Sequence, residues 1–95
     1  MIPVIWAPQA IEDVEAIRTY VARDSAHYAD LLVERIVAAV GRLGTFPRSG
    51  PVVPEVGDQS LREVVYEKYR IVHRVKPSAV EIVTVFHGAR LLRLE

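Results

Sequence analysis

The sequence predicts an α+β fold in which two antiparallel helices pack on one face of a mainly antiparallel sheet, in the order β-α-α-β-β-β. Two segments in the first half of the chain repeat apolar residues at helical spacing, and three short strand-like segments follow. Only brief turns separate these last three segments. Because 95 residues suffice for one modest hydrophobic core, we expect a single domain over residues 1–95.

The first strand is expected at residues 2–6, which are apolar and mostly branched, with Pro3 marking an edge strand or a strand start. Pro8 stands where the first residue of a helix is favoured. The apolar side of this first helix repeats every three to four residues and consists of Ile11, Val14, Ile17 and Val21.

Ser25 is expected to cap a second helix, and Gly44 with Pro47 is expected to end it. The apolar stripe of this helix consists of Ala29, Leu32, Val33, Ile36, Val40 and Leu43. Since the link between the two helices is short, they should be antiparallel neighbours. Residues 47–59 contain three Pro and two Gly, so we expect an irregular loop there.

Three strands are predicted at about 60–66, 69–75 and 79–86, joined by hairpin turns at 67–68 and 76–78. Residues 88–95 are too few to assign to an element. We expect the helices and the sheet to bury a common core, represented by Val14, Ile17, Leu32, Ile36, Ile71 and Ile82.

Charged side chains are spread through the predicted strands, and strand periodicity sorts them onto two faces. Tyr69, Ile71, His73 and Val75 should face the helices, whereas Arg70, Val72 and Arg74 should face away from them. The second face would then be a shallow basic concavity, which His87 and Arg90 could border. The face that Arg62 occupies depends on the strand register. For each arginine alone, pairing with a nearby glutamate on a solvated surface stays an alternative.

The formal net charge is zero, but the charge is unevenly distributed along the chain. Residues 1–58 hold five Arg against eight acidic residues, a balance of −3, and residues 59–95 hold seven Lys or Arg against four Glu, a balance of +3. An anionic partner is therefore expected for the C-terminal part. Without cysteine, and with three dispersed histidines, we expect no disulfide, metal site or cofactor.

The N-terminal residues do not have the pattern of a signal peptide, and no apolar run approaches the ~20 residues that span a bilayer. We therefore expect a cytoplasmic protein without a membrane partner.

Four segments, IWAPQAIEDVEAIRTYVA, FPRSGPVVPEV, LREVVYEKYRIVHRV and VEIVTVFHGARLL, follow one another in the order and spacing of a known family. With them the chain resembles the ParE/RelE superfamily of toxins from type II toxin–antitoxin modules over nearly its whole length. The resemblance implies the same β-α-α-β-β-β fold. The chain resembles the ParE branch more than the RelE branch, although Pro51 follows Gly50 where the ParE pattern usually has Arg.

Resemblance to the ParE branch implies a toxin that binds DNA gyrase without catalysing a reaction itself. It also implies a hetero-oligomer with a ParD-like antitoxin. Residues expected to bind the target or the antitoxin are Arg62, Arg70, Arg74, His87, Arg90 and Arg93.

Resemblance to the RelE branch implies instead a ribosome-dependent mRNA endonuclease. Glu55 would then accept the 2′-OH proton, Arg70 would contact the phosphate, and His87 would protonate the leaving oxygen. This acid–base set is incomplete, because no Tyr or His follows residue 87 in the sequence. A third interpretation is a ParE-like protein that binds its partner but is not toxic.

Overall fold

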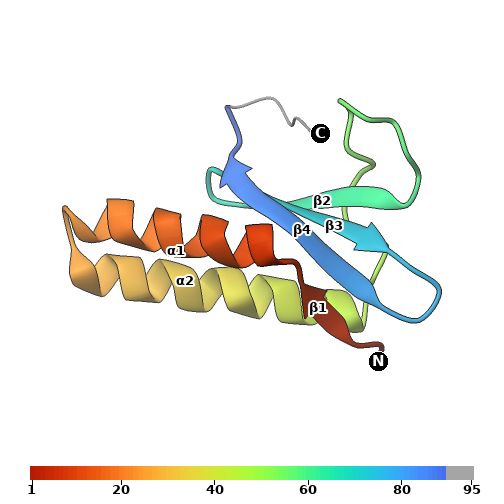
Figure 1. Cartoon of the computed structure of the whole chain (residues 1–95), viewed down its shortest axis with the longest axis horizontal. Coiled ribbons are helices and arrows are strands. Elements are labelled where there is room, and N and C mark those ends of the chain that lie inside the picture. The colour runs from red at the N-terminus through yellow and green to blue at the C-terminus, as the bar shows by residue number, and fades with distance from the viewer. Residues whose placement is uncertain (90–95) are drawn as a thin grey trace.

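Two helices pack on one face of a four-stranded sheet in the computed structural model, which describes residues 1–89 (Figure 1). The elements are β1 (Val4–Trp6), α1 (Pro8–Ala22), α2 (Ala26–Gly41), a 3₁₀ helix η1 (Arg42–Gly44), β2 (Leu61–Tyr66), β3 (Tyr69–Val75) and β4 (Val80–His87). The predicted fold class and element order are confirmed. Arg90 and Arg93, which were expected to bind a partner, lie outside the described residues.

The strands are ordered β1-β4-β3-β2 in the sheet. Two antiparallel hairpins join β2, β3 and β4, as the short turns predicted, and β1 pairs in parallel with β4. Strand β1 covers three residues rather than the five predicted. Pro3 lies just before β1 and has no N–H to donate, yet its carbonyl accepts a hydrogen bond from the Val80 N–H at 2.9 Å.

The helices begin where the sequence indicates. Pro8 is the first residue of α1, and the Ser25 hydroxyl accepts a hydrogen bond from the Tyr28 N–H at 3.1 Å to cap α2. The position expected for Ile11 was wrong, because Ala10 is the residue fully buried against the sheet and Ile11 lies on the outer flank of α1. Ala10 lies one helical turn before Val14 and shares its inner face, whereas Ile11 is rotated by about 100° from Ala10 around the helix.

The main core fills the space between the helices and the sheet. Leu32, Ile36, Ile71 and Ile82 are all buried there, and Val14 packs with them, as predicted. Ile17 is only partly buried and packs at the edge of this cluster.

The connection between η1 and β2 covers part of the opposite face of the sheet, which the sequence had predicted to be open. This connection is irregular, as expected, apart from a bridge between Val52 and Arg62. Val53 is fully buried and packs against Leu61 and Val72 in a second, smaller core. Gly50 has φ +79°, and a Cβ there would lie 1.9 Å from the Glu63 carbonyl oxygen. Only glycine therefore lets the connection approach β2 so closely.

We expect Leu32→Ala and Ile36→Ala each to lower the free energy of unfolding by about 2–5 kcal/mol, because each removes a fully enclosed side chain. Urea denaturation measures the loss. Val37→Ala, on the exposed side of the same helix, is the matched control and should change stability by less than about 1 kcal/mol. Equal midpoints for Leu32→Ala and Val37→Ala would contradict the observed helix packing.

Candidate functional site

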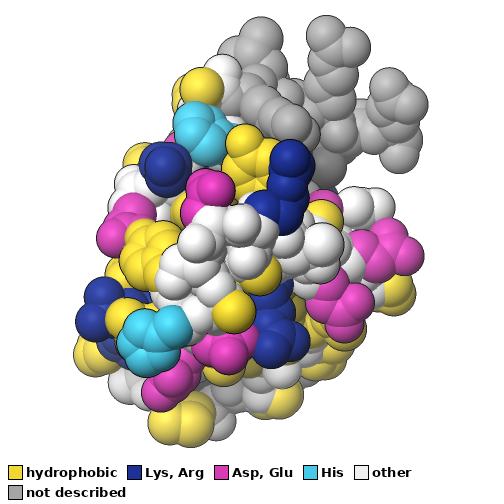
Figure 2. Space-filling model, turned by 90° about the vertical axis from the view of Figure 1, so that its left-hand side faces the viewer, with side chains coloured by type: hydrophobic (Ala, Val, Ile, Leu, Met, Phe, Trp, Pro, Cys, Tyr) yellow, Lys and Arg dark blue, Asp and Glu magenta, His cyan; other side chains and the backbone are white. Residues whose placement is uncertain are grey.

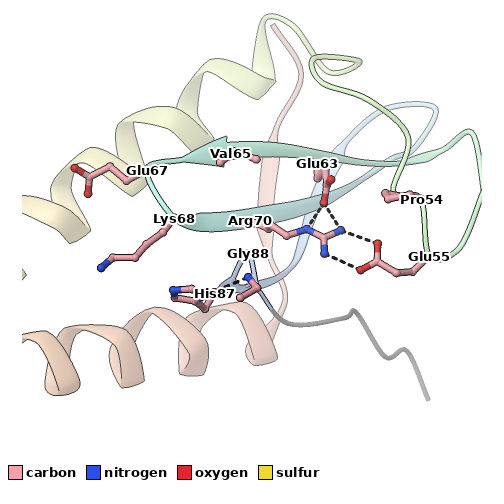
Figure 3. Close-up of a pocket in the computed structure, with 10 residues that line it drawn as sticks. Pro54, Glu55, Glu63, Val65, Glu67, Lys68, Arg70, His87 and Gly88 are labelled. Atoms are coloured by element: carbon pink, nitrogen blue, oxygen red, sulfur yellow. Dashed lines mark hydrogen bonds and ion pairs between the residues drawn. The ribbon is translucent and has the colours of Figure 1, made fainter.

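A guanidinium group held between two carboxylates is the most strongly connected polar feature of the sheet (Figure 3). Arg70 Nε donates to Glu63 Oε1 at 2.6 Å, while Nη1 and Nη2 donate to the two oxygens of Glu55 at 2.6 and 2.7 Å. The side chains of Arg70, Glu55 and Glu63 are only 10%, 16% and 11% exposed. The guanidinium carbon also lies 4.9 Å from the centre of the Phe86 ring.

The register of the β2–β3 hairpin and the buried Val53 place these three side chains together. Val65 lies opposite Arg70 and Glu63 opposite Val72, so Glu63 is the diagonal neighbour of Arg70 on the same face. Val53, two residues before Glu55, fixes the loop on this face. Hydrogen bonds to Glu55, and then to Glu63, raise the pKa of the Arg70 guanidinium above its usual value, although burial acts in the opposite direction.

Basic side chains of β2 and β3 hold the connection between η1 and β2 at four successive points. Near the start of the connection, His73 Nε2 lies 2.9 Å from the Pro47 carbonyl, and Arg62 Nη1 donates to the Gly50 carbonyl at 3.0 Å. Further along, Arg70 binds Glu55, and Arg74 Nη1 donates to Asp58 Oδ2 at 3.4 Å. We call residues 45–60 the anchored loop. Cationic and titratable side chains in the strands thus bind an internal partner, namely this loop.

The predicted basic concavity was therefore wrong. Arg70 is neutralised by carboxylates, Arg74 pairs with Asp58, and Arg62 lies opposite His73 on the helix-facing side of the sheet. His73 is fully buried, as expected for a core histidine. Figure 2 shows acidic side chains interspersed among the basic ones at the end of the molecule formed by the α1–α2 and β2–β3 turns.

His87 ends β4 and reaches the same cavity as Glu55 and Arg70, which is also lined by Glu63, Lys68 and Gly88. Its ring packs edge-on against Tyr69 with the ring centres 6.1 Å apart. The Ala89 N–H donates to His87 Nδ1 at 3.1 Å. The structure therefore brings all three nuclease candidates to one cavity, with His87 on the other side of Arg70 from Glu55 (Figure 3).

This geometry limits the acid–base chemistry that the cavity can perform. Glu55 and Glu63 accept hydrogen bonds from Arg70 on both edges of its guanidinium, so a phosphate would have to displace carboxylates to bind there. The bond from the Ala89 N–H requires His87 Nδ1 to carry no proton. A cationic imidazolium, the form that donates a proton to a leaving oxygen, would lose this bond.

The sequence left open that an arginine of the strands pairs with a nearby glutamate, and Glu63 is such a partner of Arg70. The two-residue turn at 67–68 places Glu63 diagonally from Arg70. The structural role of another acidic residue was not predicted. Asp13 of α1 accepts hydrogen bonds from the Thr84 hydroxyl and, at 3.0 Å, from the Val85 N–H. These bonds tie α1 to β4 across a sequence distance that no local pattern reveals.

A second surface with binding potential is the groove between the outer flanks of α1 and α2. Its lining is mainly apolar and includes Trp6, Ile11, Val33 and Val37. Ile11 and Val37 are 47% and 49% exposed, so this groove presents neighbouring apolar side chains to solvent.

Residues 1–89 contain neither a cluster of metal-binding side chains nor a helix that could span a membrane. In this part of the chain no three His, Asp or Glu side chains are placed to hold a metal ion. None of its helices is both long and apolar enough to cross a membrane.

Comparison with known proteins gave a family match and relatives of the same size. Residues 4–92 match the model of the ParE toxin of the type II toxin–antitoxin system parDE. Toxin RelE2 of Caulobacter vibrioides is 34% identical over 92 residues, covering 96% of this chain and all of that protein.

Solved structures match the fold. The chromosomal ParDE system of P. aeruginosa matches with a TM-score of 0.76 and 24% identity, covering 92% of this chain and 96% of that one. The toxin–antitoxin complex RelBE2 of Mycobacterium tuberculosis matches with a TM-score of 0.54 and 18% identity over 94% and 93% of the two chains.

We expect Arg70→Ala to lower the free energy of unfolding by about 3–5 kcal/mol, because it leaves two carboxylates buried without their cation. Arg18→Ala is the matched control, since the Arg18–Asp30 pair is mostly exposed and should contribute less than about 1 kcal/mol. Urea denaturation of the two variants gives the comparison. A loss for Arg70→Ala as small as that for Arg18→Ala would show that the cluster does not stabilise the fold.

We expect the stability of the protein to fall as the pH drops below about 6.5, because of His73. Burial is the main cause that lowers the pKa of His73, and the positive charge of Arg62 lowers it further, against the effect of the Pro47 carbonyl. The unfolded chain therefore binds a proton at a pH where the folded chain does not, so this contribution is complete above 6.5 and decreases below it.

The measurement is the urea midpoint between pH 7.5 and 5.5 for the unmodified chain and for His73→Gln. The variant should lose most of this pH dependence, while His27→Gln, at an exposed position, should retain it. An unchanged slope in His73→Gln would assign the dependence to other groups.

Proposed function

This chain belongs to the ParE toxin family of type II toxin–antitoxin systems, and from that membership we propose that it inhibits growth by binding a target protein rather than by cleaving RNA. The proposed target is DNA gyrase, and the proposed site of action is the cytoplasm. A cognate ParD-like antitoxin would neutralise the toxin by forming a hetero-oligomer with it.

The observation that carries the proposal is the state of Arg70. A catalytic arginine must present its N–H groups to a phosphate whose charge increases in the transition state. In this chain both edges of the guanidinium donate to Glu55 and Glu63, and Glu55 is the residue that would have to accept the 2′-OH proton. The same contacts that stabilise the loop thus engage the groups that catalysis needs.

The groove between α1 and α2 supports the antitoxin part of the proposal. An amphipathic helix binds by placing its apolar side chains into such a groove, and Ile11 and Val37 are exposed on the two sides of this one. A partner segment that folds as it binds can bury this surface and extend over neighbouring parts of the toxin.

A ribosome-dependent mRNA endonuclease is the second candidate, and one observation favours it. Glu55, Arg70 and His87 come from three different parts of the chain, and all of them line one cavity. Binding of an RNA phosphate could exchange the carboxylate partners of Arg70, so the two mechanisms have to be separated in cells.

We expect Glu55→Gln to remain toxic when it is expressed without antitoxin, because the proposed mechanism needs no base at this position. Growth arrest should be accompanied by DNA breaks and an SOS response, while transcripts stay intact. Arg90→Ala and Arg93→Ala should reduce toxicity more than Glu55→Gln does. Glu67→Gln, which removes another carboxylate of the same cavity, is the matched control.

Transcript mapping within minutes of induction discriminates between the two candidates. Codon-phased cuts that disappear in Glu55→Gln would replace the proposed mechanism with the endonuclease. Harmless expression of the unmodified chain would instead favour a ParE-like binding protein without toxicity.

A further inference from the structure

Phe46 stands out because its side chain is exposed while its backbone is hydrogen-bonded on both sides. Phe46 lies in the anchored loop, two residues after the end of η1, and is 63% exposed. The Phe46 N–H donates to the Arg42 carbonyl at 3.0 Å, and the Phe46 carbonyl accepts from the Ser49 N–H at 3.1 Å and the Ser49 hydroxyl at 2.8 Å. These contacts define the backbone on both sides of the exposed ring.

The residue after Phe46 is fixed as well. Pro47 has a restricted φ, and its carbonyl lies 2.9 Å from Nε2 of the fully buried His73. The ring therefore projects from a backbone attached to the sheet. Little conformational entropy would be lost when another molecule covers it, which is the advantage of a preorganised binding group.

Two cations accompany Phe46 in a shallow depression at the N-terminal end of the molecule, where the β3–β4 turn also lies (Figure 1). Arg48 and Lys76 line this depression together with the apolar Ile2 and Pro77. Glu81 Oε1 lies 3.6 Å from Lys76 Nζ and offsets part of the positive charge of Lys76. The depression therefore has an apolar centre and a positively charged border.

We propose that Phe46, Arg48 and Lys76 form a docking surface for an acidic segment of a partner protein. An aliphatic side chain of that segment would cover the Phe46 ring, and carboxylates beside it would pair with Arg48 and Lys76. Interfaces concentrate their binding energy in a few aromatic and arginine side chains at an apolar centre, and charge complementarity around the centre selects the partner.

A nucleic acid is the other anionic ligand class, but the surface fits it less well. Two prolines and an isoleucine occupy the depression, which offers only two cationic side chains for phosphates. The chain as a whole carries no net positive charge. This surface is separate from the cavity at Arg70 and from the groove between α1 and α2, so the inference does not depend on the proposed function.

The first test is an NMR titration of the isotope-labelled protein with the acetylated tetrapeptide DLEL, and with NLQL as the uncharged control peptide. We expect amide shifts confined to residues 45–49 and 75–78, produced by DLEL only. Phe46→Ala and Arg48→Glu should each weaken DLEL binding about tenfold, whereas Val56→Ala, an exposed apolar position of the same loop, should not. Denaturation midpoints close to that of the unmodified protein verify that the variants fold.

Three results would overturn the proposal. Equal shifts with NLQL would remove the role of charge, and shifts outside the two segments would move the site elsewhere. Tighter binding of a short single-stranded RNA to the same residues would assign the surface to nucleic acid.

A second measurement uses the two proposed partners, a cognate ParD-like antitoxin and purified DNA gyrase. Phe46→Ala and Arg48→Glu should weaken the binding of at least one of them about tenfold, and Val56→Ala should weaken neither. Full binding of both partners by Phe46→Ala would count against the proposal. If the unmodified chain binds neither the antitoxin nor gyrase, the proposed function is contradicted. The peptide titration still tests the docking surface in that case.

Discussion

The ion pairs and hydrogen bonds between the basic residues of β2 and β3 and the anchored loop are the constraint on which most of this structure depends. The helices cover only one face of the sheet, and residues 1–89 form no further helix or strand that could cover the other face. The loop covers part of that second face by inserting Val53. Without the contacts made by Arg70 and the neighbouring basic residues, little would offset the conformational entropy that this loop loses when it adopts one conformation.

This arrangement also explains why a sheet with many cationic residues does not behave as a basic surface. Each cation that the strand pattern directs away from the helices meets an acceptor from a segment that follows η1. Two cations of the basic C-terminal part pair with acidic residues of the first part, Arg70 with Glu55 and Arg74 with Asp58. Counting charge along the sequence shows the asymmetry but does not show where each charge finds its partner.

The helices, the strands and the main core could be predicted because their signals are local. Leu32 and Ile36 belong to a repeat with helical period, and the two-residue turn at 67–68 defines a hairpin. The same turn also defines the register, from which the Glu63–Arg70 diagonal follows. The position of Glu55 could not be predicted, because it depends on the path of an irregular loop and on long-range contacts such as the burial of Val53. Hence the fold could be predicted from the sequence. For the candidate site, the sequence indicated which residues to consider but not how they are arranged in space.

The spacing of the contacts along the anchored loop has a consequence for its motion. Pro47, Gly50, Val53, Glu55 and Asp58 each touch the sheet, so no stretch of more than two residues between them lacks an attachment. Local unfolding of a surface loop normally costs little free energy and does not require the elements that the loop connects to unfold. This one has its attachment points distributed over both β2 and β3, so most of them must break together. Its amide hydrogens should therefore exchange with solvent in the same cooperative unit as the sheet, and an irregular segment becomes, energetically, part of the strand layer.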